Sequence, residues 1–326
     1  MTIAEILEGI KQVRALVIGD ICLDRWCTYD PATTEPSAET GIPRLGIVAV
    51  EGTPGGGGNA ANNLAALRPA KVAALGVRGA DGHGFELDHA LRQRGIDTSL
   101  MVEVPQWQTF TYTKLLNCQT GVEDKPRVDF INTRPLPAEA ERRVLDKLEA
   151  AIDEFDAVLV ADQAETSAGG VVTAAVRESL IGLAAKYPAK IFLADSRRRV
   201  HLFRHLMVKP NRSEAEAACQ TLFGDVDFKR LRECLEAKAL FLTQGPRGAL
   251  VYEEGKETWS RPRPVEKPVD ICGAGDSFAA GTALALAVTH DAVEAASFGN
   301  IVASITVMKK GTGTASPGEI LAVALR

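Results

Sequence analysis

The sequence lacks closely spaced cysteines and contains few histidines. Its five histidines show no mutual spacing of metal ligands, and none of its six cysteines belongs to a C-x-x-C pair: Cys22, Cys27, Cys118, Cys219, Cys234 and Cys272. In a chain of 326 residues, such scatter favours reduced and mostly buried thiols over a disulfide framework or a zinc site. The chemistry of this protein is therefore expected from other side chains.

The sequence also lacks an excess of positive charge and any long apolar run. Thirty-seven Lys and Arg against 42 Asp and Glu give a net charge of −5, and no basic cluster is interleaved with aromatic residues. This excludes the usual nucleic-acid-binding surface. No uncharged apolar run approaches the roughly 18 residues of a membrane helix, and the first residues do not resemble a signal peptide. We expect a cytoplasmic protein that binds small molecules.

Short apolar runs alternate with helical patterns along most of the chain. With 46% hydrophobic and 24% charged residues, the chain can form one large α/β core. Runs suited to buried strands occur at 13–19, 71–75, 156–161 and 190–194. We therefore expect a single domain over residues 1–326, with a doubly wound, mostly parallel sheet and helices on both faces. Ligands bind at the carboxyl ends of such strands, where four aspartates follow: Asp20, Asp24, Asp162 and Asp195.

The stretch DICGAGDSFAAG at 270–281 carries the strongest chemical signal. Gly273, Ala274 and Gly275 precede a helix expected at 277–288, so backbone N–H groups and the helix dipole converge on one spot that favours an anion. Asp276 lies in the same turn, where its carboxylate would repel that anion. This unfavourable placement indicates that Asp276 has a chemical role. The pattern therefore indicates phosphoryl transfer to a hydroxyl with Asp276 as the base. The plainer alternative is a helix cap with turn glycines.

A second glycine-rich stretch, PGGGGNAANNLAAL at 54–67, also begins a helix. Its glycines, among them Gly55 and Gly56, let the backbone approach a ligand closely, and Asn59 can both donate and accept toward sugar hydroxyls. A dinucleotide-binding loop is the competing interpretation. That interpretation would need G-x-G-x-x-G spacing and an acidic residue after the strand at 71–75, and the sequence has neither.

Three segments do not fit the strand–helix alternation. The segment 25–51 contains three prolines, and short runs rich in β-branched and aromatic residues lie at 109–114 and 127–131. We expect these segments to pair in a small antiparallel sheet formed by about 25–51, 100–116 and 126–132. The pattern fits both a lid over the site and an ordinary extension of the main sheet.

Together these stretches resemble the ribokinase-like (PfkB) carbohydrate kinases. Residues 270–281 are similar to the signature D-T-x-G-A-G-D-x-F-x-x-G and depart from it only at Ile271. Residues 55–59 are similar to G-G-x-x-x-N, with the glycines one residue closer to Asn59. The resemblance runs from residue 13 to about 317. It implies the ribokinase-like fold, ATP-dependent phosphorylation of a sugar, Asp24 at the sugar, and a lid that covers the sugar and commonly forms a homodimer.

The resemblance also implies nucleotide and metal sites. Lys209 and Asn211 would lie near the nucleotide phosphates, and Asn211 with Glu214 would help to hold Mg²⁺ through waters. The nucleotide pocket would also contain Thr243, Gly245, Gly248 and Asn300. Each has a structural alternative: a capping box for Asn211 and Glu214, a hairpin turn for 245–248 and a packing hydrogen bond for Asn300. Backbone carbonyls of 311–316 could hold K⁺, as in some relatives.

Several short stretches look most like the heptose-phosphate kinase branch, namely 19–25, 111–114 and 127–130. That resemblance makes heptose 7-phosphate, phosphorylated at position 1, the leading acceptor. Two departures concern this substrate: the branch tends to have D-Y-A-K-G and D-P-K-G where this chain has Asp162-Gln-Ala-Glu165-Thr and Asp195-Ser-Arg197-Arg. We expect the phosphorylated acceptor to be bound by Asp162 and by the cations Lys114, Arg127 and Arg197.

Rival functions have distinct sequence requirements. A plain hexose or pentose kinase would need no cations for an acceptor phosphate. A sugar-binding regulator would have lost catalysis, and the intact Asp276 argues against it. The length of the chain leads us to expect a kinase domain without a nucleotidyltransferase domain.

Overall fold

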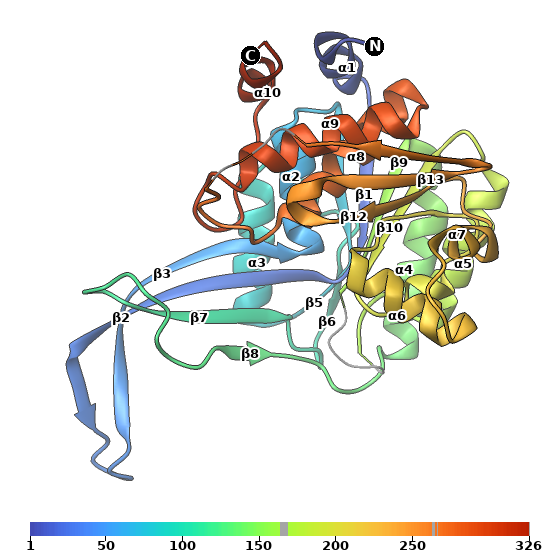
Figure 1. Ribbon diagram of the computed structural model, residues 1–326. Helices are drawn as coiled ribbons and strands as arrows, with labels where there is room; N and C mark the ends of the chain where they lie inside the picture. The colour runs from blue at the N-terminus through green and yellow to red at the C-terminus, as the bar shows by residue number, and fades with distance from the viewer. Residues whose placement is uncertain (164–168, 263–264, 266, 326) are drawn as a thin grey trace.

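The structure is a computed structural model that describes residues 1–163, 169–262, 265 and 267–325. Its centre is an eight-stranded sheet with the order β14-β13-β12-β11-β10-β9-β1-β4 (Figure 1). All neighbours from β4 to β12 run parallel, whereas β13 and β14 are added antiparallel at one edge. The strands are β1 Arg14–Gly19, β4 Lys71–Leu75, β9 Ala157–Asp162, β10 Ile191–Ser196, β11 Met207–Val208, β12 Leu240–Thr243, β13 Ala249–Glu253 and β14 Lys256–Ser260.

Helices cover both faces of this sheet, which explains why its parallel strands are apolar throughout. In β1, Ala15 and Val17 pack into one core, whereas Leu16 and Ile18 pack into the other. The first face is covered by α1 Ile3–Ile10, α2 Gly57–Ala66, α3 Gly82–Gln93, α8 Ala274–Thr289, α9 Ala292–Thr306 and α10 Pro317–Ala324. The second is covered by α4 Ala138–Ala151, α5 Ala174–Lys186, α6 Arg212–Phe223 and α7 Phe228–Cys234. The expected doubly wound fold is confirmed.

A second sheet, β3-β2-β7-β8, projects from the body of the molecule (Figure 1). Its strands are β2 Ile21–Pro36, β3 Pro43–Gly56, β7 Thr111–Asn117 and β8 Val128–Phe130. Its two hairpins are antiparallel, and its central pair, β2 and β7, runs parallel. The β2–β3 hairpin contains the three prolines of the segment 25–51. Pro31 lies within a register shift and Pro36 faces Pro43 at the end of the ladder, two places where a missing N–H is tolerated.

Only part of the range 100–116 belongs to this second sheet. Strand β6, Val102–Val104, instead pairs in parallel with β5, Val77–Gly79. The helix α3 lies between β5 and β6 in the chain, and a crossover of this kind joins parallel strands. We call the β3-β2-β7-β8 sheet the lid from here on.

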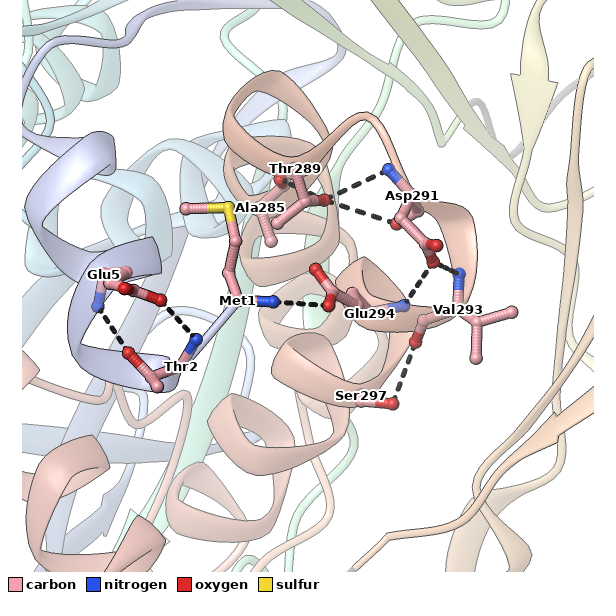
Figure 2. A network of polar contacts seen from close by, with 9 residues as sticks. All are labelled: Met1, Thr2, Glu5, Ala285, Thr289, Asp291, Val293, Glu294 and Ser297. Carbon is pink, nitrogen blue, oxygen red and sulfur yellow. Dashed lines mark hydrogen bonds and ion pairs between the residues drawn. The ribbon is translucent and has the colours of Figure 1, made fainter.

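The turn between α8 and α9 is fixed by a network of polar contacts (Figure 2). Asp291 caps α9 by accepting from the N–H groups of Val293 and Glu294, both at 2.8 Å. The amino group of Met1 donates to Glu294 Oε1 at 2.5 Å. The next residue, Thr2, is the N-cap of α1 and forms a capping box with Glu5. This network anchors the end of α8 that lies far from Asp276. None of the helices in the described ranges has the length and apolar character needed to cross a membrane.

Helices α8 and α9 approach each other closely because glycines lie at their contact. A Cβ atom at Gly299 would lie 2.3 Å from Thr282 Oγ1 and 2.8 Å from the carbonyl oxygen of Phe278. A Cβ at Gly281 would lie 2.9 Å from a methyl of Val302. Since Asp276 lies in the first turn of α8, this contact helps to set the position of the proposed base.

We predict that Gly299→Ala lowers the free energy of unfolding by about 1–3 kcal/mol, the usual cost of an extra methyl group in a filled core. Gly182→Ala, in the exposed part of α5, is the matched control, because no described atom lies within 4 Å of its added Cβ. The control should be neutral or stabilising by up to about 1 kcal/mol. Urea unfolding of both variants measures the difference, and equal midpoints would contradict the close packing.

Candidate active site

The turn before α8 has the geometry of an anion-binding helix N-terminus. Gly273 has a φ of 76° and is the N-cap residue of α8. A Cβ at this position would lie 2.6 Å from Asn59 Nδ2, so both the backbone conformation and the space require glycine. The N–H of Ala274 donates to the Ile271 carbonyl at 3.2 Å. Helix geometry therefore leaves the N–H groups of Gly275 and Asp276 to face an anion.

Asp276 lies in the first turn of α8, and its carboxylate contacts the start of α2. Asn59 Nδ2 donates to Asp276 Oδ2 at 2.6 Å. Desolvation and the nearby Asp195 carboxylate raise the pKa of Asp276 to about 6, although the Asn59 bond and the cations Lys209 and Arg197 act in the opposite direction. A carboxylate with such a pKa is ionised at neutral pH and is a better proton acceptor than an ordinary aspartate.

A buried ion pair lies beside this turn. Lys209 follows β11, is 4% exposed, and its Nζ lies 3.1 Å from Asp195 Oδ2 at the end of β10. Desolvation lowers the pKa of Lys209, but the carboxylates of Asp195, Glu214 and Asp276 outweigh it and raise the pKa. A Cβ at Gly275 would lie 3.6 Å from Lys209 Nζ. A permanent cation therefore borders the anion-binding turn, where it can balance developing negative charge.

The lid brings a second set of charged side chains to the same end of the sheet. The side chain of Asp24 on β2 lies against Gly55, where a Cβ would be 2.3 Å from Asp24 Oδ1. Burial raises the pKa of Asp24 to about 6, opposed by the charges of Lys114, Arg127 and Arg197. The structure thus gathers two carboxylates, Asp24 and Asp129, and three cations that lie far apart in the sequence.

Aromatic rings orient two of these cations. Lys114 Nζ on β7 lies 4.2 Å above the Trp26 ring. Arg127 stacks on the Tyr112 ring at 5.0 Å and donates twice to Asp129 Oδ2, at 3.0 and 2.7 Å. Cation–π contacts of this kind restrict where a flexible side chain can place its charge.

Asp162 and Asp20 are held by the protein itself. Asp162, at the end of β9, accepts from Ser196 Oγ at 2.6 Å and from Nε and Nη2 of Arg199. Asp20 accepts the backbone N–H groups of Gln163 and Val171 at 2.8 and 2.7 Å, and its burial raises its pKa to about 6. The pairing of Arg199 was missed from the sequence, because its run of arginines has the pattern of a solvated loop. Glu165, where the heptose branch has lysine, lies outside the described residues.

The expected nucleotide residues lie beyond the Lys209–Asp195 pair. Asn211 and Glu214 form the capping box, with reciprocal bonds of 2.9 and 2.8 Å. Thr243 donates its N–H to the Pro210 carbonyl at 3.0 Å. Gly245 and Gly248 have positive φ values of 56° and 89° and frame the short helix η3, Gly245–Arg247. The turn therefore needs its glycines for conformation.

Asn300 on α9 makes a buried structural contact at the same place. Its Nδ2 donates to the carbonyl and hydroxyl oxygens of Ser260 at 2.9 and 2.8 Å. A Cβ at Gly248 would also meet the Ser260 carbonyl, at 2.3 Å. Next to it, a hollow of about 360 Å³ is lined by Pro246, Arg247, Trp259, Arg261 and Pro262. Trp259, which the sequence pattern did not single out, offers this hollow an aromatic face.

The arrangement combines an anion-binding turn, a raised-pKa carboxylate and a charged lid at the carboxyl ends of a doubly wound sheet. It defines the class of kinases that phosphorylate a hydroxyl of a small molecule. The chain belongs to the pfkB family of carbohydrate kinases, which it matches over residues 16–318. Membership of this family excludes the dinucleotide-dependent oxidoreductase.

Individual relatives are similar over almost the whole chain. The bifunctional protein HldE of Geobacter sulfurreducens is 31% identical over 95% of this chain and 62% of its own length. The protein of the same name from Pelobacter propionicus is 31% identical over 99% of this chain and 66% of its own length. The chain therefore spans about two thirds of the length of these relatives.

Solved structures support the same fold. A ribokinase from Thermotoga maritima is 20% identical, with a TM-score of 0.69 over 96% of this chain and 100% of that chain. Phosphofructokinase-2 from Escherichia coli, in complex with potassium, is 19% identical, with a TM-score of 0.71 over 96% and 99% of the two chains.

We predict that Arg199→Ala lowers the free energy of unfolding by about 3 kcal/mol, because it leaves the Asp162 carboxylate buried without its cation. Asp162 and Arg199 side chains are 1% and 21% exposed. Arg198→Ala is the matched control, since Arg198 is exposed, and should change stability by less than about 0.5 kcal/mol. Thermal and urea unfolding compare the two variants. If Arg199→Ala changes the free energy of unfolding only slightly, the Asp162–Arg199 pair is not mainly structural, and Asp162 keeps its expected role toward the substrate.

Proposed function

We propose that this protein transfers the γ-phosphate of ATP to a hydroxyl of a sugar phosphate, with position 1 of heptose 7-phosphate as the leading acceptor. The observation that carries this proposal is Asp276, a carboxylate with a pKa of about 6 in the first turn of α8. The names of the HldE relatives support the heptose branch of the family.

Asp276 accepts the proton of the attacking hydroxyl as that oxygen bonds to the γ-phosphorus of ATP. The bond from this phosphorus to the β,γ-bridging oxygen breaks, and ADP leaves. The turn from Gly273 to Asp276 holds the charge that develops on the transferred phosphoryl group. The N–H groups of Gly275 and Asp276 are best placed to do so, because the Ala274 N–H donates to the Ile271 carbonyl. Lys209 adds a fixed positive charge beside the same turn. Positioning and charge stabilisation are the main contributions that a protein makes to phosphoryl transfer.

The acceptor would lie between the lid and α2. Asp24 binds a sugar hydroxyl there, next to Gly55 and Gly56 at the end of β3. Asn59 on α2 forms the opposite wall. Lys114, Arg127 and Arg197 supply the positive charge that a phosphate on the acceptor needs. All three act on the Asp24 carboxyl electrostatically, which supports a common site. Arg197 would take over the role of the lysine in the D-P-K-G stretch of the heptose branch.

ATP would extend from the anion-binding turn toward the hollow beside Trp259. In this arrangement Lys209 and Asn211 lie near the phosphates, and Thr243, Gly245, Gly248 and Asn300 border the nucleoside. Asn211 and Glu214 fit a hydrated Mg²⁺, because the capping bond uses only Glu214 Oε2 and magnesium keeps several waters. When bound, Mg²⁺ screens the charge of the phosphates. No group of three or more acidic, His or Cys side chains in the described ranges competes for a metal.

The loop 311–316 fits a potassium ion less well. The carbonyl oxygen of Thr314 already accepts from Lys309 Nζ at 2.6 Å, and Lys309 also pairs with Glu319. The lysine ammonium group therefore already binds a carbonyl of the loop that was expected to bind K⁺.

We also propose a cytoplasmic homodimer formed through the lid. The β2–β3 hairpin exposes Ile42, Ile47, Val48 and Val50, between 43% and 67%. Exposed apolar side chains grouped on one projecting element are typical of an interface.

We predict that Asp276→Asn reduces the rate of phosphorylation about 10²- to 10⁴-fold, because the amide cannot accept the proton. Folding and ATP binding should stay close to those of the unmutated protein. Steady-state kinetics over a panel of sugars and sugar phosphates, with ATP binding by calorimetry, measures both. A variant within about threefold of the unmutated rate would remove Asp276 from the mechanism. Absence of activity in the unmutated protein over the whole panel would favour the regulator.

We predict that Arg127→Ala raises the KM for a phosphorylated acceptor by an amount equivalent to about 1.5–3 kcal/mol, the value of a hydrogen bond to a charged group. The KM for ATP should not change. Arg134→Ala, an exposed arginine outside the lid strands, is the control. Equal turnover of phosphorylated and unphosphorylated sugars by the unmutated protein would move the assignment to a hexose or pentose kinase.

A further inference from the structure

Two asparagines one helical turn apart on α2 form a chain of hydrogen bonds that ends at Asp276. Asn63 Nδ2 donates to Asn59 Oδ1 at 3.2 Å and to the Asn59 carbonyl at 3.0 Å. Asn59 Nδ2 in turn donates to Asp276 Oδ2 at 2.6 Å. Both asparagines are 1% exposed, so water cannot replace these partners easily.

The direction of this chain is fixed by what each group can donate. An ionised carboxylate only accepts hydrogen bonds, whereas an amide has an NH₂ end and an oxygen end of almost the same shape. If the Asn59 amide turned over, its oxygen would face the Asp276 carboxylate at close range, and two acceptors would repel each other. Asn63 offers an N–H to the oxygen end of Asn59. It therefore stabilises the orientation in which the NH₂ end faces Asp276.

Asn63 destabilises the folded state, and this argues that it is present to orient the Asn59 amide. Its Oδ1 is buried and has no hydrogen-bond partner, and an unsatisfied buried acceptor destabilises the folded state. An apolar residue of similar size would avoid this cost on a helix that packs between the sheet and α8. The position is thus better suited to directing Asn59 than to stabilising the core.

We propose that Asn63 is a positioning residue that orients the Asn59 amide, so that Asp276 Oδ2 is occupied and Oδ1 is directed to the acceptor hydroxyl. This proposal rests on the proposed role of Asp276 as the base. It gives Asn59 a function toward the base in addition to the contact with sugar expected from the sequence.

The consequence for Asp276 depends on every charged group around it. Asp195 on β10 raises the pKa of Asp276, whereas Lys209 and Arg197 lower it, and these three groups are untouched by a change at Asn63. The Asn59 bond favours the ionised carboxylate, so losing its orientation raises the pKa of Asp276 further above 6. Since the base must be ionised, activity should then be lost at a higher pH.

We predict that Asn63→Leu moves the acidic limb of the kcat/KM profile upward by about half to one pH unit, which is a loss of roughly two- to fivefold at pH 6. Activity should approach that of the unmutated protein above about pH 8, and the KM for ATP should stay the same. Asn62→Leu is the matched control, because Asn62 is the neighbouring asparagine on α2 and is half-exposed. Thermal unfolding of both variants accompanies the kinetics.

Superimposable pH profiles of the unmutated protein and a folded Asn63→Leu variant would overturn the proposal, as would an equal shift in Asn62→Leu. If leucine prevents folding, Asn63→Ala decides by the same criteria. The proposed function fails separately: it falls if the unmutated protein phosphorylates no sugar or if Asp276→Asn keeps its rate. With both of those results as expected, an unshifted profile removes only the role of Asn63.

Discussion

The bond between Asn59 and Asp276 is the contact on which the arrangement of the site depends. It joins the first turns of α2 and α8, although Asn59 and Asp276 are 217 positions apart in the chain. Both helices begin at glycines with positive φ, Gly56 at 52° and Gly273 at 76°. At Gly273 even a methyl group would displace the Asn59 amide. Two helix N-termini therefore meet at the carboxyl ends of the sheet, where their dipoles favour the same anion.

The topology of the sheet creates the place for this meeting. From β1 the chain pairs β4 on one side and β9 on the other, so the connections leave in opposite directions and open a crevice at the carboxyl ends. The lid begins directly after β1, because β2 starts at Ile21. The lid and α2 are consequently carried by the chain that leaves β1, whereas α8 follows β14. A Cβ added to Gly311 would lie 3.8 Å from the Trp26 ring, so the loop before α10 lies close to the lid.

The sequence was sufficient for features that depend on local patterns. The turn at 273–276, the capping box of Asn211 and Glu214, and the parallel strands are set by neighbouring residues, and the structure contains them. Features that depend on long-range contacts were not predictable. The Arg199–Asp162 pair and the Asn63–Asn59–Asp276 chain join residues whose individual patterns indicate a solvated loop and an ordinary helix.

The titration of the buried carboxylates connects stability with function. Burial raises the pKa values of Asp20, Asp24 and Asp276 to about 6, above their ordinary value of 3.8. The folded state therefore holds these protons more tightly than the unfolded chain, and stability falls as the pH rises from about 4 to 6. At neutral pH all three groups are ionised at a cost to folding. Asp20 recovers part of this cost from two backbone N–H groups. In the function proposed above, a sugar hydroxyl would donate to Asp24. On that proposal, the ionised site is less stable alone than with its substrate, and a bound substrate would stabilise the folded state.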